Sequence, residues 1–307
     1  MPVTRANIVD GPGSFSLGAL ALFSAANIVA DFVPETFSVP VSTDGEADTR
    51  FAGAKCDISF TPSGRLTAGI LAALFPAAFR TPVVGTSVFG AADTAGFCHS
   101  TAGKKITFTS CAITKPPELI LSPAATLFGQ IGIEALIKTG GVPTDADAYY
   151  VASDAAWSET FDPDEPITVP YTAAWGAITL NTEDGFRVTC EPQLAPRRVT
   201  GQGIIDYKLQ DVIWRASCRP VDLTAATLLG YMAPAARDIG SSMRAGSNLV
   251  IAGGAGGIDC TLYDASVVKG PCNWGATELR AGEIGFLAHR NDTGVDLGAK
   301  ALLAIAT

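Results

Sequence analysis

Two distant segments of the chain share one pattern: alternating strand residues followed by a stop at proline. Residues 104 to 123 read KKITFTSCAITKPPELILSP, and residues 257 to 275 read GIDCTLYDASVVKGPCNWG. Alternation of apolar and polar residues is typical of a half-buried β-strand. Proline has no N–H to donate to a neighbouring strand, so Pro116, Pro117 and Pro271 mark strand ends. The sequence therefore predicts a β-rich chain in which one strand-and-turn unit occurs twice.

Further matches between the halves follow in the same order at nearly constant spacing. The aligned pairs are Phe37 and Val39 with Phe186 and Val188, Leu66, Thr67 and Ala68 with Leu223, Thr224 and Ala225, Thr107, Lys115 and Pro117 with Thr261, Lys269 and Pro271, and Ile131 and Gly132 with Ile284 and Gly285. Each match is weak alone, but four ordered blocks indicate an internal duplication.

The chain of 307 residues is long enough for two domains of ordinary size. Most of the pattern is strand and turn, with amphipathic helices expected over residues 66 to 75 and 222 to 232. An acidic, proline-containing stretch over residues 146 to 180 is expected to connect the halves. We thus predict a mainly β (α+β) chain with a first domain over residues 1 to 145 and a second over residues 181 to 307.

Composition and charge exclude several functions. Apolar residues make up 48% of the chain, which provides for a sizeable core, but no unbroken run is long enough to predict a membrane span. The first residues lack the basic and apolar regions of a signal peptide. The net charge of −9 argues against a protein that grips nucleic acid through its phosphates. An acidic protein can still surround DNA without binding it.

The seven cysteines form no C-x-x-C pair, and several lie in apolar strand-like runs. This pattern favours buried, reduced thiols in a protein assembled in a cytoplasm.

Residues for catalysis or for holding a cofactor are few. The only histidines are His99 and His289, too few for most nucleophilic triads, and His99 and Cys98 would point to opposite faces of a strand. The glycines from Gly253 to Gly257 fail the dinucleotide-binding pattern, and a strand follows them where a helix is required, so a turn between antiparallel strands is the better interpretation. The sequence predicts no catalytic site and no cofactor.

A metal site is also not expected. The acidic residues in and next to the connecting stretch lack the spacing of a known calcium loop, and acidic loops are usually solvated. These residues are Asp145, Asp147, Asp162, Asp164 and Glu165.

Two polar segments, residues 43 to 55 and 194 to 208, join long strands at equivalent places in the halves. We expect them to be surface loops that are able to reach a neighbouring subunit.

Much of the chain resembles the major tail tube proteins of long-tailed bacteriophages. The resemblance rests on ETFSVPVSTDGEADTRFAGAKCDISFTPSGRL, KITFTSCAITKPPELILSPAATLFGQIGIEAL, ITVPYTAAWG and NLVIAGGAGGIDCTLYDASVVKGPCNWGATELRAGEIGFLA. It implies β-sandwich or barrel domains, each flanked by one short α-helix. It also implies a non-enzymatic virion protein whose six-domain rings stack into a DNA-conducting tube.

With two domains in a chain, three chains would complete a pseudo-hexameric ring. The other partners implied are tape measure, tail terminator and distal tail proteins, with assembly in the host cytoplasm. The resemblance places inter-ring contacts in the two polar segments, so the expected assembly residues are Asp44, Glu46, Asp48, Arg50, Arg197 and Arg198.

Two other functions stay open from the sequence. One is a secreted or surface β-sandwich module that binds carbohydrate or protein. The other is an oxidoreductase with a nucleotide at Gly253 to Gly257.

Overall fold

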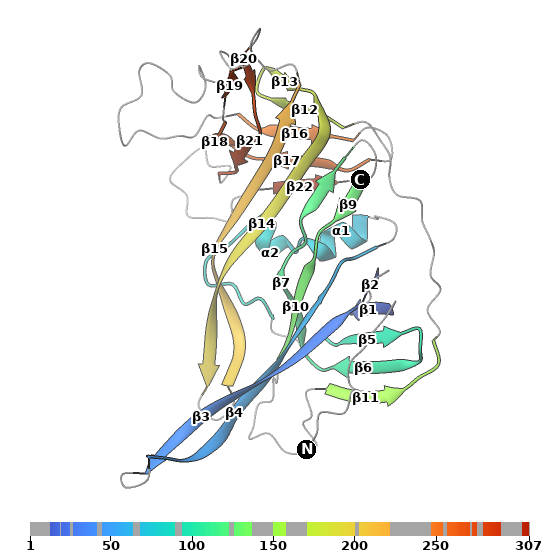
Figure 1. Ribbon diagram of the computed structural model, residues 1–307, viewed down its shortest axis with the longest axis vertical. Helices are drawn as coiled ribbons and strands as arrows, with labels where there is room; N and C mark the ends of the chain where they lie inside the picture. The colour runs from blue at the N-terminus through green and yellow to red at the C-terminus, as the bar shows by residue number, and fades with distance from the viewer. Residues whose placement is uncertain are drawn as a thin grey trace.

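The computed structural model describes residues 13–18, 20–24, 27–41, 45–63, 68–89, 94–122, 126–136, 150–157, 171–199, 203–221, 247–253, 257–270, 272–274, 279–289 and 303–306. Antiparallel strands make up most of this part of the chain, in four sheets and one two-stranded ribbon (Figure 1). The prediction of a mainly β chain is confirmed.

The first half forms two sheets, with strand orders β11-β6-β5-β1-β2 and β3-β4-β10-β7. The strands and helices of this half are β1 (Gly13–Leu17), β2 (Leu20–Ser24), β3 (Val29–Val41), β4 (Gly45–Phe60), α1 (Ala68–Leu74), α2 (Ala77–Arg80), β5 (Gly96–Ser100), β6 (Lys104–Phe108), β7 (Cys111–Lys115), β8 (Leu119–Leu121), β9 (Thr126–Phe128), β10 (Ile131–Leu136) and β11 (Tyr150–Asp154).

The second half forms sheets with strand orders β13-β12-β16-β17-β22 and β18-β21-β15-β14, and the latter is extended by β8 and β9. Its strands are β12 (Thr172–Trp175), β13 (Ile178–Leu180), β14 (Thr182–Val199), β15 (Gly203–Pro220), β16 (Leu249–Ala252), β17 (Asp259–Leu262), β18 (Ser266–Lys269), β19 (Cys272–Trp274), β20 (Leu279–Ala281), β21 (Ile284–Leu287) and β22 (Leu303–Ala306).

The two halves repeat one arrangement of strands, down to its irregularities. The first sheet of the first half, β11-β6-β5-β1-β2, corresponds strand by strand to β22-β17-β16-β12-β13 in the second half. The other sheet, β3-β4-β10-β7, corresponds in the same way to β14-β15-β21-β18. The register slips where Gly132 lies opposite Lys115, and again where Gly285 lies opposite Lys269. The glycines and the lysines hold equivalent places in the two halves, as the sequence alignment predicted. A bulge kept at the same place in both copies is strong support for duplication.

A tight turn is repeated as well. Gly18 and Gly176 follow β1 and β12, and both have φ +59°, a conformation that glycine adopts without steric cost. Each donates its N–H to the strand beside it, Gly18 to Ala95 O at 3.0 Å and Gly176 to Asn248 O at 3.4 Å.

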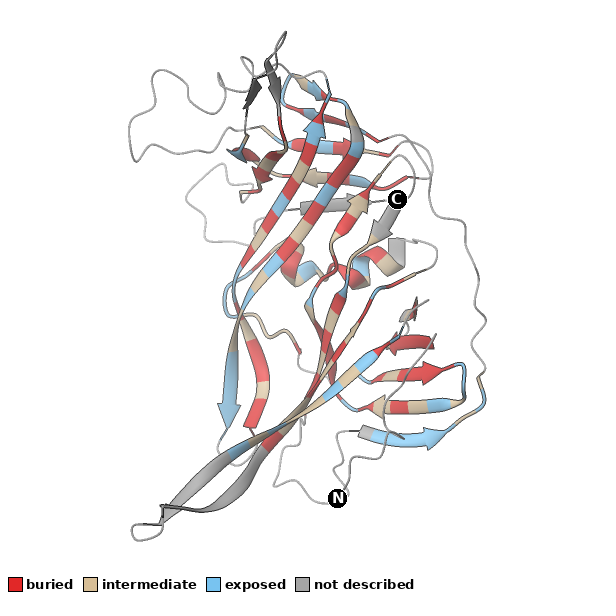
Figure 2. Cartoon of the chain, viewed as in Figure 1, coloured by how far each residue is buried: buried red, intermediate tan, exposed pale blue. Residues whose placement is uncertain are grey.

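The core lies between the sheets and is continuous through both halves. Alternate residues of each central strand point inward, as Figure 2 shows by the regular change of colour along β14 and β15. Trp214 and Phe15, from different halves, are both fully buried in the same apolar cluster. Helix α1 confirms the helix expected at residues 66 to 75, while the helix expected at 222 to 232 lies outside the described residues.

The expectation of polar loops at residues 43 to 55 and 194 to 208 was wrong. Residues from Gly45 onward belong to β4, and residues up to Val199 and from Gly203 belong to β14 and β15. The sequence missed these strands because bulges interrupt the alternation, for example between Gln193 and Leu194. The distal end of β14 is also exposed, so no apolar face marks it as a strand.

Residues 104 to 123 and 257 to 275 each contain three strands, two before the proline and one after it. The strands before the proline are β6 and β7 in the first segment and β17 and β18 in the second, and in each case these two strands belong to different sheets. At the break between β6 and β7 the buried positions shift by one residue, from Ile106 and Phe108 to Cys111 and Ile113. The sequence prediction treated the whole stretch before the prolines as one strand and so missed the change of sheet.

Two further expectations need correction. The stretch 146 to 180, expected as a connection, contains β11 of the first half and β12 and β13 of the second. The alignment of Phe37 with Phe186 was also wrong. Val29 pairs with Ser59 as Arg187 pairs with Ser217, and these serines lie opposite the equivalent Gly132 and Gly285. Val29 is therefore the counterpart of Arg187, and Phe37 is not that of Phe186.

Candidate assembly surface

Each half carries one long two-stranded arm, and the β3–β4 arm reaches well beyond the sheets (Figure 1). The predicted residues Glu46, Asp48 and Arg50 lie on β4, paired through the backbone with Pro40, Val39 and Phe37. Their side chains, and all of Asp44, lie outside the described residues.

The predicted residues Arg197 and Arg198 are exposed near the distal end of β14. Nη1 of Arg198 donates to Glu35 Oε2 on β3 at 3.0 Å, so this pair links the arms of the two halves. Sequence reasoning missed Glu35, because nothing local shows which strands from different halves will meet.

A strand addition joins the halves. Strand β8 of the first half pairs antiparallel with β14 of the second, with Leu119 opposite Val188 and Leu121 opposite Phe186. These four side chains are buried, and main-chain pairing with buried alternate side chains is how a strand adds to a sheet edge. The β8–β9 hairpin of one half thus completes the sheet of the other.

The double proline lies at this crossing. Pro116 and Pro117 are buried between β7, at the edge of the first-half sheet, and β8, at the edge of the second-half sheet. Because neither can donate to a ladder, the chain leaves one sheet here and joins the next. The prediction that these prolines end a strand is confirmed.

Gly185 allows β8 to lie close to β14. Its φ is +81°, and a Cβ added there would lie 2.0 Å from the carbonyl oxygen of Leu121. Any larger residue would push β8 away from β14.

The segment before β5 forms a second seam between the halves. Residues 85 to 88 run antiparallel to the distal part of β15: Gly85 N–H donates to Leu209 O at 2.8 Å, and Val88 N–H donates to Tyr207 O at 3.0 Å. The buried Asp206 carboxylate accepts from Ser87 Oγ at 2.7 Å.

A small apolar cluster closes this seam with residues of both halves. Its members are Phe89, Ala112, Leu136, Ile204 and Tyr207. Burial is the main cause that raises the pKa of Tyr207, and a hydrogen bond with Glu134 adds to it. The hydroxyl therefore stays protonated at neutral pH.

Trp214 fixes the helices of the first half to the second-half sheet. Its Nε1–H donates to Phe79 O at 2.8 Å, and its ring lies 5.7 Å from that of Phe75. A fully buried indole with its one donor satisfied is a strong anchor.

Two strand edges in the described part of the chain lack the partner that their equivalents have. The sheet containing β3 ends at β3, whereas β14, its counterpart, pairs on that side with β8. The ribbon β19–β20 pairs only with itself, whereas β8–β9, its counterpart, pairs with β14.

On the sheet faces turned away from the main core, lysine and arginine side chains form ion pairs with carboxylates. Lys55 Nζ lies 3.0 Å from Asp57 Oδ1 and 3.7 Å from Glu134 Oε2, across β4 and β10. On the second half, Arg215 Nε lies 3.7 Å from Glu191 Oε1. In each pair a carboxylate offsets the positive charge of the neighbouring side chain.

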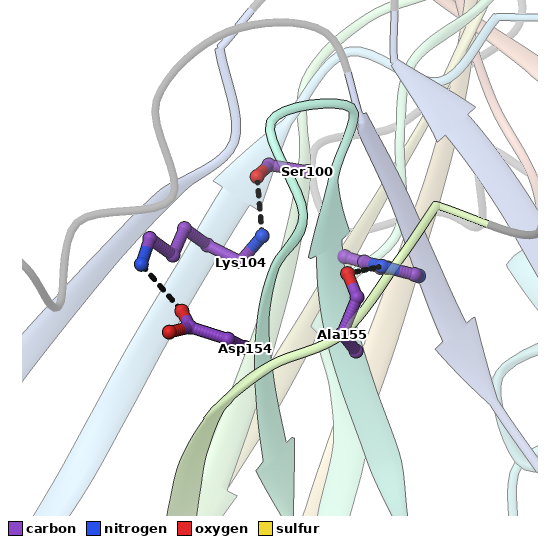
Figure 3. A network of polar contacts seen from close by, with 5 residues as sticks. Ser100, Lys104, Asp154 and Ala155 are labelled. Carbon is purple, nitrogen blue, oxygen red and sulfur yellow. Dashed lines mark hydrogen bonds and ion pairs between the residues drawn. The ribbon is translucent and has the colours of Figure 1, made fainter.

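His99 has a structural role. The imidazole is buried, its Nε2–H donates to Ala155 O at 3.1 Å, and its ring lies 5.0 Å from that of Trp157. Figure 3 shows the adjoining ion pair between Lys104 of β6 and Asp154 of β11. These contacts hold the edge strand β11 in place.

The described residues contain no group of histidine, cysteine and acidic residues that could hold a metal ion. The five acidic residues that we considered for calcium lie outside the described part. Gly253 and Gly257 lie in the turn between the antiparallel strands β16 and β17, as predicted. Among the described helices, none has the length and apolar character needed to cross a membrane.

The residues that make the junction were missed by sequence reasoning. Leu119, Leu121 and Gly185 belong to ordinary strand patterns, and the only signal near them is the double proline. The chain matches none of the protein-family models against which it was scanned, and a search of curated proteins finds no significant match.

Proposed function

We propose that the chain is the structural subunit of a phage-type tail tube. Each half is taken as one tail-tube β-sandwich domain, and three chains form a pseudo-hexameric ring whose stacked copies conduct DNA into the host. The proposal extends to the partners named above, namely tape measure, tail terminator and distal tail proteins, and to a virion assembled in the host cytoplasm.

One observation carries this proposal. Two copies of the same strand arrangement lie side by side in one chain, and they are joined by adding a hairpin of the first to the sheet edge of the second. A contact between unlike edges of equivalent units is head-to-tail, and repeating it gives a closed ring or a filament.

Charge also supports the proposal. The chain carries −9 overall, and lysine and arginine side chains on the polar sheet face lie beside carboxylates. A lumen with these properties would let DNA pass without holding it.

Electron microscopy of negatively stained protein tests the function. We expect stacked rings or tubes with threefold symmetry in solutions of purified protein. A uniform population of single chains at all concentrations tried would reject the tail-tube proposal and favour the binding module.

Shortening the β3–β4 arm should stop rings from stacking while leaving the fold intact. The paired residues 39 to 48 would be replaced by Asn-Gly, a two-residue turn that suits a hairpin. This end of the arm lies beyond the sheets (Figure 1), so we expect a melting temperature close to that of the unchanged protein. Rings without tubes in the microscope are the expected result. Tubes of normal length would contradict the role of the arm between rings.

A further inference from the structure

We propose that the β19–β20 ribbon of one chain adds to the free edge of β3 in a second copy of the chain. Strand β19 would run antiparallel beside residues 28 to 30 and make the contact that β8 makes with β14 inside one chain. The inference rests on the proposed ring and names the surfaces that close it.

The first step is the equivalence of the two hairpins. In β8–β9, Leu119 pairs with Phe128 and Leu121 with Thr126; in β19–β20, Cys272 pairs with Ala281 and Trp274 with Leu279. All four positions of the first hairpin are separated from their equivalents in the second by the same number of residues. Leu119, for example, corresponds to Cys272. The two hairpins therefore have the same backbone pairing and the same place after the bulged strands β7 and β18.

The second step is the equivalence of the two edges. Because Val29 is the counterpart of Arg187, Ile28 and Ala30 occupy the positions of Phe186 and Val188. Ile28 is fully buried, as Phe186 is. Ala30 packs against the core, on the side where Val188 is buried.

Together these equivalences fix the register. Leu119 lies opposite Val188 and Ile120 opposite Arg187 in the junction inside the chain. Carrying both strands to their equivalents places Cys272 opposite Ala30, and Asn273 opposite Val29.

The edge of β3 has the properties of a strand that awaits a partner. Val29 is 52% exposed on this outer strand, and an exposed apolar edge is a template for pairing with another chain. Before Ile28, Asn27 occupies the position that Gly185 has in the second half. Asn27 does not share the positive φ of Gly185, so we expect pairing to begin at Ile28.

In the described part of the structure the β19–β20 ribbon pairs only with itself and lies well apart from β3 (Figure 1), so the contact is not made within the chain. A second copy supplies the missing strand, and its own free ribbon then meets a third. The contact is head-to-tail. A ring therefore closes when the rotation that relates one copy to the next is a whole-number fraction of a full turn.

The test uses the native thiol of Cys272. Residues directly opposite in an antiparallel pair have Cα atoms about 4.5 to 5.5 Å apart, within the range of about 4.4 to 6.8 Å for a disulfide. The variant Ala30→Cys, assembled and treated with oxidised glutathione, should give disulfide-linked dimers and larger species on a non-reducing gel. Reducing agent should return them all to single chains.

Matched variants control the result. Val29→Cys places the thiol one residue out of register, on the other face of the strand, and should cross-link at least about tenfold less. The double variant Ala30→Cys with Cys272→Ala should not cross-link. The pair Leu119→Cys and Val188→Cys, placed at the internal junction, should form a disulfide within a single chain and so confirm the geometry.

A second measurement needs no substitution. Hydrogen exchange of the unchanged protein should slow at residues 272 to 274 and 28 to 30 when single chains assemble.

The outcomes separate this inference from the proposed function. Tubes that form without cross-linking of Ala30→Cys, or with equal cross-linking of Val29→Cys, would overturn the pairing and leave the tail-tube proposal standing. Cross-linked rings that never stack would support the pairing and count against the tube. Protein that stays as single chains under all conditions would overturn both.

Discussion

The folded protein should lose most of its stability as the pH rises from about 8.5 to about 10. Six cysteines of the described residues are free and buried: Cys56, Cys98, Cys111, Cys190, Cys218 and Cys260. Burial is the main cause that raises the pKa of each thiol, to about 12 for Cys111, Cys218 and Cys260. In the unfolded chain the same thiols ionise near their ordinary pKa of about 8.5.

The direction follows from proton binding. Above about pH 8.5 the unfolded chain releases thiol protons that the folded chain retains, so the free energy of unfolding falls as pH rises. Each buried thiol contributes a loss of about 1.4 kcal/mol per pH unit until its folded pKa is reached. Six thiols together would remove on the order of 8 kcal/mol per unit, comparable to the whole stability of a typical domain.

Urea unfolding at several pH values checks this. We expect midpoints that are nearly constant from pH 7 to 8 and fall steeply from pH 9. Cys260→Ala removes one of the six thiols. The free energy of unfolding of this variant should therefore fall about one-sixth less steeply with pH, whatever stability the substitution itself costs at pH 7. A constant midpoint up to pH 10 would show that the thiols do not govern alkaline stability.

Gly185→Ala should destabilise the protein by about 3 kcal/mol or more, through strain and through separation of β8 from β14. The φ of +81° alone costs an alanine about 1 to 2 kcal/mol, and its Cβ would lie 2.0 Å from Leu121 O. The backbone oxygen belongs to the paired strand, so the contact can be relieved only by moving the junction apart.

Gly85→Ala is the matched control. Gly85 has a similar φ of +87°, and a Cβ added there meets nothing within 4 Å. We expect only the conformational cost of about 1 to 2 kcal/mol at this site. Thermal and urea unfolding of both variants, followed by tryptophan fluorescence, would measure the difference. Equal destabilisation would mean that the β8–β14 junction tolerates displacement.

The sequence predicted the parts of the fold that depend on local patterns. Alternation identified most central strands, the helix at residues 66 to 75 was found, and the repeated blocks around Lys115 and Lys269 were aligned correctly. These features are visible because a strand with one buried face keeps a period of two.

The features that could not be predicted involve exposed strands or contacts between residues far apart in the sequence. Bulges interrupt the alternation in both arms, and the distal end of β14 is exposed, so these strands read as polar loops. The change of sheet between β6 and β7 leaves only a one-residue slip in the alternation. The addition of β8 to β14 joins residues far apart in the sequence, such as Leu121 and Phe186. Of the six expected assembly residues, Arg198 makes an ion pair between the two halves, with the unpredicted Glu35.

The crossing at Pro116 and Pro117 has a consequence for the kinetics of assembly. Because β8 and β14 belong to one chain, their junction forms at the high effective concentration of an intramolecular contact, typically in the millimolar range. The proposed contact between β19 and β3 of a second copy would depend on the concentration of subunits. A ring of six domains built from three such chains would need two encounters between molecules, whereas six separate domains would need five. The proposed rings would therefore form from a more dilute pool of newly made protein.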